Sequence, residues 1–143
     1  MFPACEGEDA LINHGIWGKR LADFLRERLR TEGFAAEEPI AEDWGWVVPI
    51  VNDQFRLWIG CACNSEYPDG FLCFIEPHTP LVRKFLKQIE TRERVTALQQ
   101  ALDKVLSEAA GIREKCWWTY EELQNPGALR RREPQGGASQ KSG

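Results

Sequence analysis

The spacing of apolar residues near the start of the chain predicts an amphipathic helix. Between Ile16 and Glu32, apolar side chains recur at steps of three and four residues, as they do along one side of a helix. The stripe consists of Trp17, Leu21, Phe24, Leu25 and Leu29, with the stem of Arg28 at its edge. Gly33 follows the last turn, and glycine readily adopts the left-handed conformation that ends many helices.

The stretch from Glu42 to Glu76 predicts three β-strands in a row. Its apolar runs are rich in β-branched and aromatic residues, and residues typical of turns separate them at Asn52-Asp53 and Pro68-Asp69-Gly70. The expected strands cover residues 44–51, 55–63 and 71–76. Because the turns are short and polar, an antiparallel meander is expected.

Two prolines limit the expected sheet. Pro39 should end a short first strand over residues 34–38, because proline supplies no backbone donor. For the same reason, Pro49 indicates that its strand lies at an edge of the sheet or contains a bulge.

Each of the three strands is apolar on both of its alternating faces, so both faces need cover. We expect one face to form the core, with Trp44, Trp46, Val48, Phe55, Leu57 and Ile59. The other face carries Trp58, Leu72 and Phe74, and it is either covered by a remaining helix or left for a partner.

The second half of the chain predicts two helices and a final strand. Pro80 is expected to open a short helix over residues 81–89 with Thr79 as its N-cap, and Thr91 to cap a helix over residues 92–110. Residues 112–121 favour a strand, with a short helix over residues 119–123 as the alternative. The expected fold is α+β: an antiparallel sheet of four to five strands, an N-terminal helix and a C-terminal helix pair, in the order α-β-β-β-β-α-α-β.

The domain organisation follows from where these patterns begin and end. Residues 1–14 show no periodicity and are expected to form a loose lead-in, followed by a single domain over residues 15–123. Residues 124–143 have little to bury and are expected to be disordered.

The charge distribution bears on partners. The net charge is −4, but residues 124–143 hold four cations against one carboxylate, which leaves −7 on the body from Met1 to Leu123. Such an acidic body repels phosphate backbones, so no nucleic-acid partner is expected. It suits a basic partner protein, although solubility alone also explains it.

Neither a membrane partner nor export is expected. No run of 18 apolar residues exists, and the N-terminus lacks a basic start followed by an apolar stretch. The five cysteines are therefore expected to be reduced thiols in a cytoplasmic protein.

Cysteine and histidine offer one candidate site. Cys61 and Cys63 share a strand face, and Cys73 falls on the next strand. A fourth ligand for a metal would have to be Cys116 or His78, both distant in the sequence. We favour packing for these thiols, because free cysteine behaves as a small buried apolar residue. No metal, cofactor or catalytic residue is expected, since no known catalytic or phosphate-binding motif occurs.

Acidic and tryptophan residues offer a second candidate site. Glu37, Glu38, Glu42 and Asp43 lie just before Trp44 and Trp46. The simplest interpretation is a solvated acidic loop. The alternative is a recognition patch, in which tryptophans act as anchors inside a charged rim and Trp58 contributes its outward face.

The order of elements, together with the sequence Glu42-Asp43-Trp44-Gly45-Trp46 at the start of a strand, resembles a family of small bacterial α+β proteins of no assigned activity. The resemblance covers residues 15–121. It implies the fold and a bacterial cytosolic setting, and it implies no functional residue.

These observations favour a non-catalytic protein-interaction module: an acidic inhibitor, immunity-type or adaptor protein. One alternative is a small enzyme or a metal- or ligand-binding domain that uses Cys61, Cys63, Cys73 and His78. Another is a homodimer formed through the uncovered sheet face or the Pro49 edge.

Overall fold

The computed structural model describes residues 2–8, 17–63, 70–112 and 114–123. The chain divides into two units, residues 1–110 and residues 111–143, which are described separately below. The sequence had predicted one domain over residues 15–123. No helix in the described part of the chain is long and apolar enough to cross a membrane.

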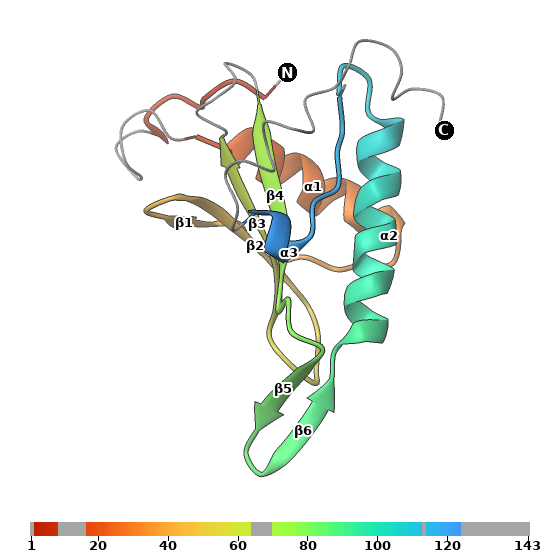
Figure 1. The fold of residues 1–143 in the computed structure, drawn as a ribbon. Helices are drawn as coiled ribbons and strands as arrows, with labels where there is room; N and C mark the ends of the chain where they lie inside the picture. Colours follow the sequence, from red (N-terminus) through yellow and green to blue (C-terminus); the bar gives the residue numbers. More distant parts are fainter. Residues whose placement is uncertain (1, 9–16, 64–69, 113, 124–143) are drawn as a thin grey trace. The chain divides into compact units, whose positions relative to one another are not determined.

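The first unit is an α+β fold, as predicted (Figure 1). Its elements are α1 (Lys19–Thr31), β1 (Ile40–Glu42), β2 (Gly45–Ile50), β3 (Leu57–Cys63), β4 (Phe71–Glu76), β5 (Leu81–Lys84), β6 (Lys87–Glu90) and α2 (Arg92–Glu108). The first four strands form one antiparallel sheet in the order β1-β2-β3-β4, which confirms the meander. Strands β5 and β6 form a separate hairpin.

Helix α1 matches its prediction closely. Leu21, Leu25 and Leu29 are buried one turn apart along the side that faces the sheet. Gly33 ends the helix at a positive φ of 86°, and its backbone N–H donates to the carbonyl of Arg30. A residue with a Cβ would be strained in that conformation.

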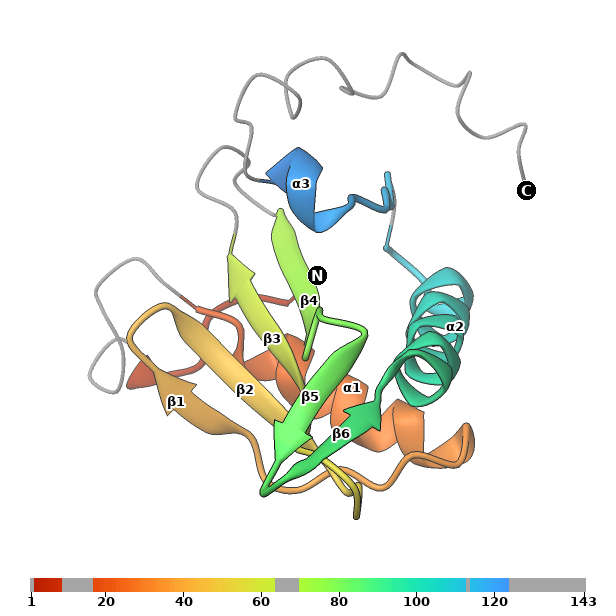
Figure 2. The same ribbon diagram turned by 60° about the horizontal axis from the view of Figure 1, so that its bottom comes forward.

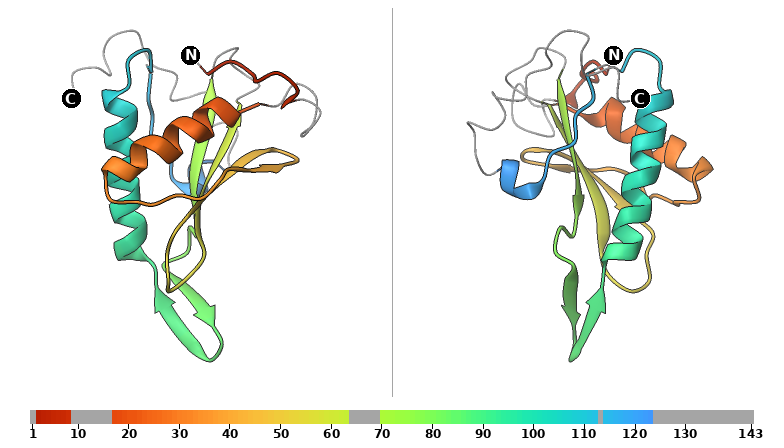
Figure 3. Two further views of the ribbon diagram at one scale, coloured as in Figure 1. Left: turned by 180° about the vertical axis from the view of Figure 1, so that it is seen from behind. Right: turned by 45° about the vertical axis from the view of Figure 1, so that its right-hand side comes forward.

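Both long helices cover the same face of the sheet (Figures 2 and 3). The strand register sets this inner face, because directly paired residues of antiparallel strands point to the same side. Trp46, Cys61 and Cys73 form one inner row, and Val48, Ile59 and Ile75 form the next. The core joins these rows to the buried sides of α1 and α2, the latter through Leu98, Leu102 and Val105.

The predictions for Pro39 and Pro49 need correction. The first strand follows Pro39 instead of ending at it, and residues 34–38 form only an isolated bridge between Ala36 and Ile50. Strand β2 lies inside the sheet and is no edge strand, but its pairing with β1 ends at Val47, so Pro49 lies just beyond that ladder. Because Pro49 has no N–H, it contributes only its carbonyl, which accepts from the backbone N–H of Glu37 at 2.9 Å.

A hairpin replaces the short helix predicted over residues 81–89. Val82 pairs with Ile89 across the two strands, and both pack against the core. Thr91 fixes the base of the hairpin: its N–H donates to the carbonyl of Pro80, and its buried hydroxyl donates to the carbonyl of Thr79. Thr79 therefore caps no helix.

The second unit contains one short helix, α3 (Tyr120–Leu123), among its described residues. Residues 114–119 form no strand, so the preferred prediction was wrong and the helical alternative is confirmed. Thr119 and Glu122 form a capping box. The backbone N–H of Thr119 donates to the Glu122 carboxylate at 3.0 Å, and the backbone N–H of Glu122 donates to the Thr119 hydroxyl at 3.1 Å. The predicted disorder of residues 124–143 lies outside the described residues.

Candidate functional site: the outer face of the sheet

Helices α1 and α2 lie on one side of the sheet (Figure 3), and the register places a group of aromatic side chains on the opposite face. Trp44, Trp58 and Phe74 lie within ring-contact distance of one another, and we call them the outer aromatic cluster. Their ring centroids are 6.1 Å apart for Trp44 and Trp58, 5.2 Å for Trp44 and Phe74, and 5.6 Å for Trp58 and Phe74. All three side chains are partly exposed.

Gly60 makes room for this cluster. It is paired with Phe74 in the sheet, and a Cβ at residue 60 would fall inside the Phe74 ring. The Phe74 ring therefore occupies the space above Gly60, and it contacts both indoles. On the far side of the cluster, the Arg56 guanidinium lies 5.7 Å from the centre of the Trp58 ring, a favourable cation–π distance.

Trp44 and Trp46 lie on opposite faces, whereas the sequence placed both in the core. Residues 43 and 44 form the two-residue turn between β1 and β2, so Trp44 precedes the strand and does not follow its alternation. Gly45 permits the change of direction with a φ of 155°, and a Cβ there would collide with the carbonyl oxygen of Cys61. Trp44 consequently joins the outer aromatic cluster.

Trp46 is 4% exposed and has a polar partner that sequence reasoning missed. Its indole N–H donates to the carboxylate of Glu8 at 2.7 Å. The same carboxylate accepts from the backbone N–H groups of Cys5, Gly18 and Lys19, each at 2.8 Å, so it covers the start of α1. Trp46 is a structural residue here and is not available on the surface.

The Glu8 carboxylate is held in its charged form. Burial by itself raises its pKa, but the hydrogen bonds from three backbone N–H groups and from the Trp46 indole together lower the pKa below its ordinary value of 4.5. Glu8 is 2% exposed, and Phe2 packs against Phe24 and Phe71. The described part of the predicted loose lead-in is therefore packed on the body.

The four predicted acidic residues fall into two places. Glu42 and Asp43 are exposed at the β1–β2 turn, beside Trp44. Glu37 and Glu38 precede β1, and Glu38 forms an ion pair with Arg26 of α1. Of the four acidic residues, only Glu42 and Asp43 are therefore next to the outer aromatic cluster, because they directly precede Trp44 at the β1–β2 turn.

The structure pairs two of the candidate cysteines but does not complete a metal site within the described residues. Cys61 and Cys73 are direct neighbours on the inner face, where a hydrogen bond with Cys73 and burial raise the pKa of the Cys61 thiol. A thiol held protonated is a poor nucleophile and metal ligand. His78 follows the end of β4 and contacts Glu76 at 2.9 Å. Within the described residues, no three His, Cys, Asp or Glu side chains are grouped to hold a metal ion.

No known protein family, curated protein or solved structure matches this chain.

Proposed function

We propose that this protein is a non-catalytic protein-binding module of the inhibitor, immunity or adaptor type, and that the outer aromatic cluster is its recognition surface. One observation carries the proposal: both helices of the first unit cover the inner face, and the outer face displays three mutually contacting aromatic rings. Aromatic side chains of this kind supply most of the binding energy in protein interfaces.

The charges near the cluster favour a partner with a basic contact segment. Glu42 and Asp43 lie at the Trp44 end, and the body carries a net charge of −7 before the basic tail. Lysine and arginine side chains pair with carboxylates and also stack on indole faces. The single cation–π contact of the cluster, between Arg56 and Trp58, is a local example of the same chemistry.

The test compares two surface variants in the full chain. Glu42→Lys combined with Asp43→Lys changes exposed side chains only, and Trp58→Ala removes one anchor. Each should weaken capture of a partner by about tenfold or more, because losing a central anchor typically costs over 1 kcal/mol. Val51→Ala, at an apolar side chain that is 49% exposed outside the cluster, serves as the control.

Two outcomes would reject this function. Wild-type capture by both variants would show that the outer face takes no part in recognition. A large loss of thermal stability in Trp58→Ala with unchanged capture would assign the cluster to the protein's own packing instead.

A further inference from the structure

The tip of the β5–β6 hairpin exposes two large apolar side chains that the protein-binding proposal does not use. Phe85 is 89% exposed and Leu86 is 101% exposed, the highest values among the large apolar residues described. They form the two-residue turn between β5 and β6, with Phe85 at a positive φ of 58°. Such turns normally contain glycine, asparagine or aspartate, so Phe85 and Leu86 are unfavourable residues at these positions.

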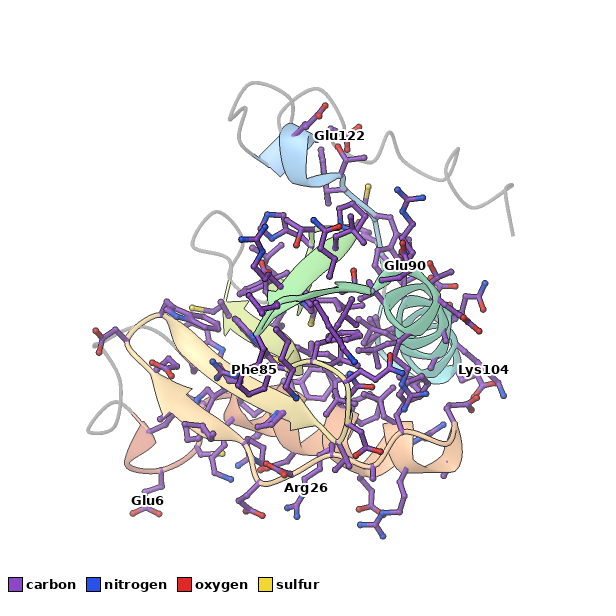
Figure 4. All side chains as sticks on the ribbon, turned by 90° about the horizontal axis from the view of Figure 1, so that it is seen from below. Glu6, Arg26, Phe85, Glu90, Lys104 and Glu122 are labelled. Carbon is purple, nitrogen blue, oxygen red and sulfur yellow. The ribbon has the colours of Figure 1, made fainter. Side chains whose placement is uncertain are left out.

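The side chains around the tip are cationic. Arg83, Lys84 and Lys87 flank Phe85 and Leu86, and no acidic residue occurs from Leu81 to Ile89. None of these three cations forms an ion pair within the described part of the chain. Phe85, which is labelled in Figure 4, and Leu86 are thus two strongly exposed apolar side chains flanked by Arg83, Lys84 and Lys87, which we call the cationic collar.

A groove extends the cationic collar toward the sheet. It has a volume of about 480 Å³ and is lined by Arg56, Arg83 and Lys84, with Asp53 as its single acidic residue. The rest of the lining includes Phe55 and Val82 of the hydrophobic core region. Its net positive charge suits an anionic group such as a phosphate or carboxylate, at the base of the same apolar tip.

We propose that the hairpin tip docks onto the surface of an anionic lipid bilayer, with Phe85 and Leu86 inserted among the acyl chains. The collar of Arg83, Lys84 and Lys87 and the groove at Arg56 would then contact the anionic headgroups. Apolar side chains inside a basic surface are the combination that binds membrane interfaces.

The size of the tip favours a bilayer over a protein partner. Stable protein interfaces bury about 800 Å² on each side, whereas one phenylalanine and one leucine supply roughly 350 Å² together. A fluid apolar phase needs no matching pocket, so a small convex tip suffices. Because the rest of the body is acidic, repulsion from an anionic surface leaves the hairpin as the end that can approach, within a screening length of about 10 Å at 0.1 M salt.

The experiment measures sedimentation of the full chain with vesicles of phosphatidylcholine alone or mixed with phosphatidylserine. Binding is expected only to the anionic vesicles and should decrease with salt. Phe85→Ser with Leu86→Ser should reduce the affinity by about a hundredfold, from the apolar area no longer inserted. Lys84→Gln with Lys87→Gln should reduce it by about thirtyfold.

Two matched variants control for general effects. Arg20→Gln removes an exposed cation from α1, and Ile40→Ser removes an apolar side chain of β1 that is 48% exposed and belongs to neither the hairpin nor the groove. Neither should change vesicle binding. Unchanged circular dichroism and melting temperature would show that the tip variants retain the fold, as expected for side chains that contact nothing in the core.

Three results would overturn the proposal. The wild type could fail to bind either vesicle, or bind both equally and independently of salt. The tip variants could change the sedimentation coefficient of the protein without lipid, which would assign the tip to a contact between two copies of the chain. Loss of a captured protein with no change in vesicle binding would assign it to a protein partner.

Discussion

Trp44 and Trp46 are separated by one glycine and lie on opposite faces of the sheet, so their surroundings allow the two faces to be compared. Trp46 is buried on the inner face, where its indole N–H donates to Glu8. Trp44 is partly exposed on the outer face, where its ring contacts Trp58 and Phe74. The same residue type is therefore buried in the core at one position and partly exposed at the other, where we propose that it contacts a partner. The two positions differ because helices α1 and α2 cover the inner face and not the outer one, and the residue type alone does not reveal this.

The largest contrast between the faces should come from removing apolar volume. Ile59→Ala empties a site on the inner face that is fully buried between the sheet and the helices, and we expect a loss of about 3 kcal/mol in the free energy of unfolding. Leu72→Ala on the partly exposed outer face should cost about 1 kcal/mol. Urea unfolding of both variants measures the difference, and equal losses would mean that both faces are equally covered.

The second contrast concerns the buried carboxylate. Glu8→Gln keeps the shape but removes the charge that four N–H groups share, so we expect a loss of about 2 kcal/mol at pH 7. Because the folded-state pKa of Glu8 is lowered, its contribution to stability is complete above the ordinary pKa of 4.5 and declines as the pH falls through the lowered value.

The pH dependence supplies the check on that variant. Urea titrations between neutral and acidic pH should give a smaller stability loss on acidification for Glu8→Gln than for the wild type. Parallel curves would indicate that Glu8 is not preferentially charged in the folded protein.

The smallest contrast comes from the two tryptophans themselves. Trp46→Phe leaves Glu8 without its indole donor and should cost about 1 kcal/mol. Trp44→Phe removes no hydrogen bond to the described part of the chain, so it should leave stability nearly unchanged while weakening partner capture. Thermal unfolding and capture assays on the pair separate the two roles, and a reversed order of stability would reject the assignment of faces.

The sequence predicted α1 and the strands β2, β3 and β4, because their periodicities are long and are bounded by clear turn or cap residues. It missed the hairpin since Leu81, Val82, Phe85, Leu86 and Ile89 also fit one side of a helix, and the turn residues Phe85 and Leu86 carry no turn signal.

The candidate site was predicted in part. Trp58 and Phe74 were assigned to the outer face from their alternation, and the register confirms this. Trp44 was misplaced because a two-residue turn interrupts the alternation one residue earlier than expected. Glu8 was missed because its partners lie 3 to 38 residues away, and no local pattern identifies such a contact.

The ring of Phe74 occupies the space that a side chain at position 60 would need. Substitutions at positions 60 and 74 therefore depend on each other. Any residue other than glycine at position 60 is acceptable only after position 74 has lost its ring, so the order in which substitutions accumulate is constrained. Among related sequences, a larger residue at 60 should therefore accompany a small residue at 74, and libraries that vary this surface should change the two codons together.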